Sequence, residues 1–222
     1  MVQTIQAQDI SLEELQENFG LQLTTDETFF REWQDKLPSL TDEEKSCLAR
    51  VRSNFFNLVN RRSLLEEGVR LARSLGRETR PGSLLKMVVL SPLLDLAGFF
   101  QSPFSIRTEK SVEISAKDKE LIVRGRIDVL VVQQRLWILV IESKSTKFDV
   151  MEALPQALAY MLGSPKSDKP KFGFLVNGRE FVFVKLQKAD IPLYSRSYAL
   201  SIDRENELEQ VLAAFKSISQ LS

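Results

Sequence analysis

The sequence predicts an α/β protein in which a mixed β-sheet is flanked by helices and preceded by a helical region. Three observations predict it: helix-start signals recur through the first third of the chain, three strand-like segments follow from about residue 107, and a helical segment separates these from a further hairpin. We therefore expect a helical N-terminal region over residues 1–80 and the α/β core over residues 81–222.

The N-terminal region carries repeated capping boxes, in which a hydroxyl residue is followed three positions later by glutamate and each side chain satisfies a free backbone amide. Three pairs fit: Ser11 with Glu14, Thr24 with Glu27, and Thr41 with Glu44. After the last pair, apolar residues recur at helical spacing at Leu48, Val51, Phe55, Leu58 and Val59. This spacing predicts a long helix with one buried face.

The core begins with an apolar segment, residues 83–97, that predicts a buried helix. Pro92 should kink or split this helix, and Gly98 should end it. A three-stranded meander is then expected, with strands over residues 107–114, 121–132 and 136–144.

The rest of the core should alternate helix and strand again. Residues 149–162 predict a helix, and Asn177-Gly178 between two apolar runs predicts a hairpin. Residues 204–218 predict a final amphipathic helix.

The composition restricts the function classes open to this chain. It has 30 basic and 30 acidic residues, no histidine and one cysteine, Cys47. Zinc held by cysteines is therefore excluded, and catalysis must use carboxylates, lysine or hydroxyls. With a formal net charge of zero, any contact with nucleic acid must be local. The lone cysteine, the lack of a secretory signal and the short apolar runs predict a cytoplasmic protein without a membrane span.

Charged residues enter the two most apolar strands, where they are costly. Asp128 lies within one strand, and Glu142 and Lys144 lie at the end of the next. A turn centred on Gln134 would put Asp128 opposite Val140 and all three charged side chains on one face, within about two rungs of ~3.3 Å. Buried carboxylates need a neutralising cation, and oxygen ligands suit Mg²⁺. The alternative, that Glu142 and Lys144 simply enter a solvated loop, leaves Asp128 unexplained.

These residues resemble the PD-(D/E)XK nucleases, which share a restriction-endonuclease-like core, over about residues 83–186. The resemblance implies that Asp128 and Glu142 bind a divalent metal, Mg²⁺ or Mn²⁺, and that Lys144 is the lysine of the catalytic motif. Gly125 also fits, because RecB-type nuclease domains of this superfamily often carry glycine near the metal aspartate.

Gln156 and Tyr160 reproduce the Q-x-x-x-Y pattern of the RecB-type domains. Spaced four residues apart, they share one helix face and could reach the metal site or a nucleic-acid backbone. The alternative is a surface glutamine and a half-buried core tyrosine.

The apolar helix over residues 83–97 is also similar to the first core helix of the nuclease domain of type I restriction motor subunits. That helix often carries a glutamate that completes the metal site, but the matching turn here reads Met87, Val88 and Val89. Glu78, upstream, is a candidate substitute, and Glu113 is a candidate supplement on the first strand.

The main hypothesis is a magnesium-dependent DNA endonuclease in which metal-activated water hydrolyses phosphodiester bonds. Four lysines near the site in sequence are candidate phosphate contacts, although they also fit ordinary loop positions: Lys147, Lys166, Lys169 and Lys171. The alternative is a catalytically degenerate nuclease-fold module for nucleic-acid binding or assembly. Aromatic residues of the N-terminal helices further suggest a homo-oligomer contact: Phe29, Phe30, Trp33, Phe55 and Phe56.

Overall fold

The structure, a computed structural model, describes residues 3–26, 28–29, 37–60, 86–116, 121–133, 136–143, 149–165 and 169–221. Its elements in chain order are β1 (Gln3–Gln6), α1 (Leu12–Phe19), β2 (Gln22–Leu23), α3 (Asp42–Asn60), the π-helical η1 (Lys86–Leu90), α6 (Ser91–Leu96), β3 (Phe104–Ser115), β4 (Leu121–Gln133), β5 (Leu136–Ser143), the 3₁₀ turn η2 (Val150–Ala153), α7 (Leu154–Leu162), β6 (Lys171–Val176), β7 (Glu180–Gln187), β8 (Leu193–Arg196), β9 (Leu200–Ser201) and α8 (Glu207–Gln220). No helix among these residues is long and apolar enough to cross a membrane.

The strands of the described residues form one mixed sheet. Its path runs β1-β4-β5-β6-β7-β8-β2, while β3 pairs with β4 and β9 pairs with β7. The β3–β4–β5 meander is antiparallel, β6 runs parallel to β5, and β7 returns antiparallel to β6. This confirms the α/β class, the meander and the hairpin at Asn177-Gly178.

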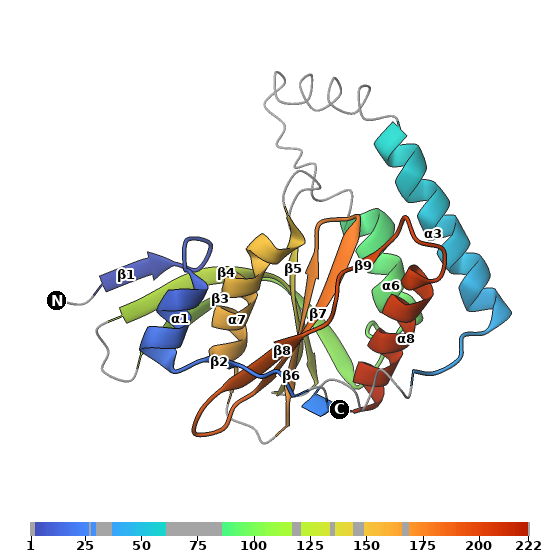
Figure 1. Ribbon diagram of the computed structural model, residues 1–222. Helices are drawn as coiled ribbons and strands as arrows, with labels where there is room; N and C mark the ends of the chain where they lie inside the picture. Colours follow the sequence, from blue (N-terminus) through green and yellow to red (C-terminus); the bar gives the residue numbers. More distant parts are fainter. Residues whose placement is uncertain are drawn as a thin grey trace.

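Helices cover both faces of this sheet and enclose two cores (Figure 1). One core contains buried residues of α3, α6 and α8, among them Phe55, Leu93 and Phe215. The other contains residues of α1 and α7, such as Leu15 and Leu158. Strands buried on both faces explain the nearly continuous apolar runs of the sequence.

Two predicted capping boxes are confirmed. The Ser11 hydroxyl accepts from the Glu14 amide at 3.1 Å, and the Glu14 carboxylate accepts from the Ser11 amide at 2.8 Å. Thr41 and Glu44 make the same pair of bonds at 3.2 and 2.8 Å, directly before α3. The third box is untested because Glu27 lies outside the described residues.

The N-terminal region is less helical than predicted. Its strand β1 pairs in parallel with β4, and β2 pairs in parallel with β8. These strands have only four and two residues, too few to show a periodic pattern, and their partners lie far away in sequence. The strands β1 and β2 therefore belong to the same sheet as the core strands, while the division of the chain at residue 80 stays a prediction.

The aromatic residues proposed for an oligomer contact are only partly described. Phe55 is buried, while Phe29 and Phe56 pack partly buried against the core of α3, α6 and α8. Phe30 and Trp33 lie outside the described residues. The homo-oligomer contact stays a prediction.

The helical winding changes next to Pro92, where a kink or a split was predicted. The π-helical turns of η1 pass directly into α6, which has the proline at its start. Proline lacks an amide hydrogen and crowds the carbonyl four residues earlier, which explains a change of helical winding here. Gly98 ends the helix with φ of 81°.

The β4–β5 register differs from the predicted one by two residues. Val140 faces Leu130, and the last pair of the ladder is Val129–Ile141. One residue of the difference arises because Gln133 pairs with Leu136, and the other arises at an irregularity next to Val131. A register that is counted from the turn assumes regular pairing and therefore takes no account of a bulge.

Candidate functional site

One edge of β4 is open between β1 and β5. Because β3 pairs along the other edge from Ile122 to Gln133, β1 and β5 must share the remaining edge. There β1 pairs with residues 121–124, and β5 pairs with residues 129–133. Among the described strands, none pairs with residues 125–128 on this edge.

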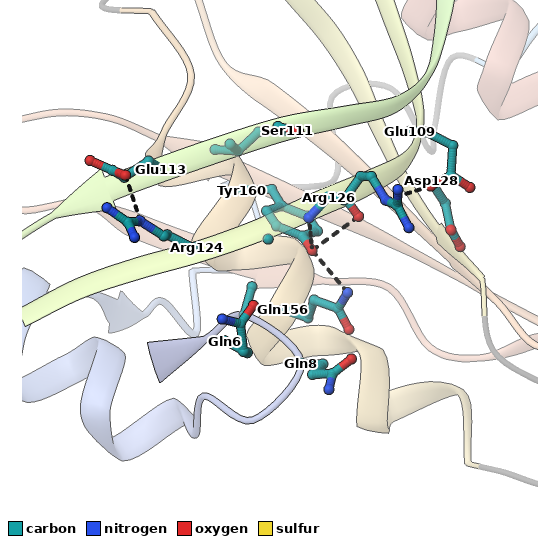
Figure 2. Close-up of a pocket in the computed structure, with 13 residues that line it drawn as sticks. Gln6, Gln8, Glu109, Ser111, Glu113, Arg124, Arg126, Asp128, Gln156 and Tyr160 are labelled. Carbon is teal, nitrogen blue, oxygen red and sulfur yellow. Dashed lines mark hydrogen bonds and ion pairs between the residues drawn. The ribbon is translucent and has the colours of Figure 1, made fainter. Parts of the chain in front are cut away.

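A pocket of about 780 Å³ lies at this opening (Figure 2). Residues of β1 and its turn, β3, β4 and α7 line it: Gln6, Ala7, Gln8, Glu109, Ser111, Val112, Glu113, Arg124, Gly125, Arg126, Asp128, Gln156 and Tyr160. The C-terminal ends of β1 and β5 both run toward it, because β1 is parallel and β5 antiparallel to β4. The topology thus places Asp128 where three strands converge.

Tyr160 takes the place of a strand partner at the open edge. Its hydroxyl accepts a hydrogen bond from the Arg126 amide at 3.0 Å and donates to the Arg126 carbonyl at 3.2 Å. The Gln156 side-chain amide donates to the same hydroxyl at 3.0 Å. Both side chains are almost fully buried, with exposed fractions of 8% for Gln156 and 2% for Tyr160. The Q-x-x-x-Y pair therefore fixes the β4 backbone two residues before Asp128.

Gly125 leaves the space that Tyr160 occupies. A Cβ at this position would lie 2.6 Å from the Tyr160 Oη and 2.6 Å from the Ala7 Cβ. Because such contacts are too short for any real Cβ, the tyrosine needs a glycine beside it. Gly125 consequently faces α7, and its neighbours Arg124 and Arg126 face the opposite side of the sheet.

Side chains of β3 and β4 alternate between the two faces of the sheet, and this alternation is interrupted next to Asp128. Ile127 and Leu130 both belong to the core under α7, whereas Val129 belongs to the core on the other face. In β3 the same change falls at Glu109, which has φ of 55°. A glutamate with a left-handed backbone is uncommon, so the fold specifies an irregularity at this point of the sheet.

Two ion pairs border the pocket on the face away from α7. Arg124 Nε lies 2.7 Å from Glu113 Oε2, and Arg126 Nε lies 2.6 Å from Glu109 Oε2. The four side chains are 50–57% exposed. Asp128 is half-buried beside the second pair (Figure 2). The pocket therefore wraps around the open edge, with α7 on one side and these charges on the other.

The predicted strand residues are described to different extents. Asp128 lines the pocket, and the backbone of Glu142 follows Ile141 in β5 and pairs with Leu175 of β6. Val129–Ile141 is the last pair of the β4–β5 ladder. Asp128 in β4 and Glu142 in β5 are the next residues beyond this pair. Lys144 lies outside the described residues.

The lysines predicted to contact phosphate lie apart from the pocket where they are described. Lys171 starts β6 and Lys169 precedes it, at the opposite end of this strand from Leu175, the partner of Glu142. Lys171 is only 3% exposed, and burial, followed by repulsion from Lys169, lowers the pKa of its ammonium group. Lys147 and Lys166 lie outside the described residues.

The donors available for a metal are carboxylates near the open edge. Asp128 lines the pocket together with Glu109 and Glu113, and each of these two glutamates is held by an arginine. The described residues contain no cluster of three potential metal ligands. Asp128 therefore fits a hard cation only together with a further donor, and Glu142 is the nearest candidate along the ladder. Glu78 lies outside the described residues.

A family model connects this site with known proteins. The model described as type I restriction enzyme R protein N terminus matches residues 63–190, which is more than half of the chain. The chain belongs to this family. The pocket lies within the matched part of the chain, except for the residues of β1 and its turn.

A solved structure offers a further comparison. It is a fragment of a putative HsdR subunit of a type I restriction enzyme from Vibrio vulnificus YJ016, with 20% identity and a TM-score of 0.37. The match covers 61% of this chain and 26% of that chain, so it spans about a quarter of the length of the chain in that structure. No curated protein matches the sequence.

The sequence patterns did not indicate much of the pocket lining. Glu109, Arg124 and Arg126 were not singled out, nor were Gln6 and Gln8. Arg124 and Arg126 alternate with Gly125 on the way to Asp128, and this spacing could have indicated a shared exposed face. Nothing in the sequence of β1 indicates its pairing with β4.

Proposed function

We propose that this protein is a metal-dependent DNA endonuclease that hydrolyses phosphodiester bonds with Asp128, Glu142 and Lys144 at its reaction centre. The observation that carries the proposal is the position of Asp128, in a pocket at the open edge of β4 toward which the C-terminal end of β5 runs. Membership of a restriction-enzyme family supports a nuclease-related role.

Asp128 and Glu142 are the residues that would hold Mg²⁺ or Mn²⁺. Residues directly opposite in an antiparallel pair lie ~5 Å apart at their Cα atoms, and the register puts these two acids one step beyond the last pair. A bound divalent ion would supply a water of lowered pKa and would neutralise charge on the phosphate oxygens.

The protein's own residues would position the substrate and balance charge. Lys144 would add a positive centre beside the scissile phosphate. Tyr160 and Gln156 would act indirectly, because their hydrogen bonds hold the Arg126 backbone and with it the position of Asp128. Pre-organised ligands of this kind reduce the reorganisation needed during the reaction.

The test is DNA hydrolysis by purified protein in Mg²⁺ or Mn²⁺. We expect Asp128→Asn and Lys144→Ala to lower the rate by at least about 10³-fold, since charge stabilisation by a metal is worth several kcal/mol. Asp190→Asn, at an exposed aspartate near β8, is the matched control and should leave the rate unchanged. Full activity in both site variants would refute the proposed centre.

A second candidate is a nuclease-fold module that binds nucleic acid or assembles with other proteins without cutting. Two observations favour it: the turn Met87–Val89 carries no acid, and the formal net charge of the chain is zero. Titration calorimetry separates the candidates. Millimolar Mn²⁺ should release or absorb heat with the wild type and not with Asp128→Asn if the site is active, and with neither protein if it is degenerate.

A further inference from the structure

Arg124 and Arg126 form a short row of positive charge that leads to Asp128. Both side chains face away from α7, because Gly125 between them faces Tyr160. They precede Asp128 by four and two residues, or ~13 and ~6.6 Å along the strand. Steps of this size are of the same order as the spacing of successive phosphates along a nucleic-acid strand.

The partners of these arginines are exchangeable. Each guanidinium is paired through Nε with one glutamate of β3, and all four side chains are at least half exposed. Exposed ion pairs contribute little to stability, since solvent and salt screen them. A phosphate offers a guanidinium the same two-oxygen geometry as a carboxylate, so replacement of one by the other costs little.

Arg124 and Arg126 are the positively charged residues among those that line the pocket. The formal net charge of the chain is zero, so the protein gives no general attraction to DNA, and a local patch must supply it. Lys169 and Lys171 lie at the far end of β6 and cannot serve a phosphate next to Asp128. The arginine row, in contrast, lines the same pocket as Asp128 (Figure 2).

From this geometry we infer that Arg124 and Arg126 contact the DNA backbone, and that Glu113 and Glu109 occupy these arginines until phosphates replace them. This inference rests on the proposed function, because it takes DNA as the substrate. It adds a phosphate-binding site at two arginines whose glutamate partners lower the affinity of the protein for DNA. The glutamates therefore have a testable effect opposite to that of the arginines.

The experiment measures binding of a fluorescent DNA duplex by anisotropy in EDTA, where hydrolysis cannot interfere, at salt concentrations from about 50 to 200 mM. Arg124→Gln and Arg126→Gln should each weaken binding. Each should also reduce the slope of log affinity against log salt concentration by about 0.9, so that the affinity of the variant falls about threefold less than that of the wild type across this range. The matched control is Arg196→Gln, an exposed arginine on β8, which should bind like the wild type.

The converse variants are Glu109→Gln and Glu113→Gln. Each should bind DNA more tightly than the wild type, by about threefold at the lower salt concentration, because one arginine is released and one negative charge is removed. Misfolding cannot produce a gain of affinity, so this arm stays informative if an arginine variant is unstable.

Three outcomes would overturn the inference: no measurable binding by the wild type, equal loss in all three arginine variants, or glutamate variants that bind no better. Tighter binding to duplex RNA than to DNA would overturn the choice of DNA. Because these measurements need no metal, they are independent of the hydrolysis assay. Failure of Asp128→Asn to affect cleavage would refute the proposed centre and leave the binding result standing.

Discussion

Replacement of Tyr160 by phenylalanine should destabilise the protein by removing one oxygen atom. The hydroxyl makes three hydrogen bonds, to the Arg126 amide, the Arg126 carbonyl and the Gln156 side chain. A net hydrogen bond is worth ~0.5–1.5 kcal/mol, and the Arg126 groups are only partly buried and can regain some bonding from water. We therefore expect a loss of about 2 kcal/mol in the free energy of unfolding.

The measurement is urea unfolding of Tyr160→Phe, with thermal unfolding as a second probe. For a chain of this size, about 2 kcal/mol corresponds to a melting temperature lower by about 4–8 °C. The matched control is Tyr198→Phe, because the Tyr198 hydroxyl also bonds a glutamine, Gln210, at 3.1 Å, but the side chain is 61% exposed. The control should change stability by less than about 0.5 kcal/mol.

The same variant should also slow DNA hydrolysis, since the backbone that carries Asp128 loses its support. Equal stability of Tyr160→Phe and the wild type, or an equal effect of Tyr198→Phe, would refute the claim that this hydroxyl replaces a strand partner. A loss of activity without loss of stability would instead assign Tyr160 a direct contact with substrate.

Two further predictions concern packing and pH. Gly125→Ala should cost about 1–3 kcal/mol of stability, because its Cβ would lie 2.6 Å from Ala7 Cβ, and adding Ala7→Gly should restore part of the loss in the same urea assay. The hydrogen bond from Lys216, 2.5 Å long, lowers the pKa of Glu44 below its ordinary value of about 4.3. The folded protein thus binds fewer protons than the unfolded chain just below that value, so this stabilisation is present above about pH 4.3 and is lost as pH falls through the folded pKa. Glu44→Gln should therefore be less stable than the wild type at pH 7 and approach it at low pH, and equal differences at both pH values would contradict this.

Local patterns in the sequence predicted most of the elements that form through local interactions. The capping boxes at Ser11 and Thr41, the change of helical winding at Pro92 and the hairpin at Asn177-Gly178 are all set by residues within a few positions of one another. The sequence also indicated Asp128 as a candidate site residue, because burying a carboxylate inside an apolar strand costs free energy unless a partner compensates it. Asp128 lines the pocket, and the roles of Asp128, Glu142 and Lys144 in metal binding and catalysis stay predictions.

Tertiary structure alone decided how these parts meet. β1 pairs with β4 across more than a hundred residues, and no local signal specifies that pairing or the open edge that it leaves. The register of β4 and β5 depended on an irregularity beside Val131, and the change of face in β3 falls at Glu109, whose backbone is left-handed. Local composition fixes which segments are strands, whereas long-range pairing fixes which charges share a pocket, because that pairing depends on the packing of the whole sheet.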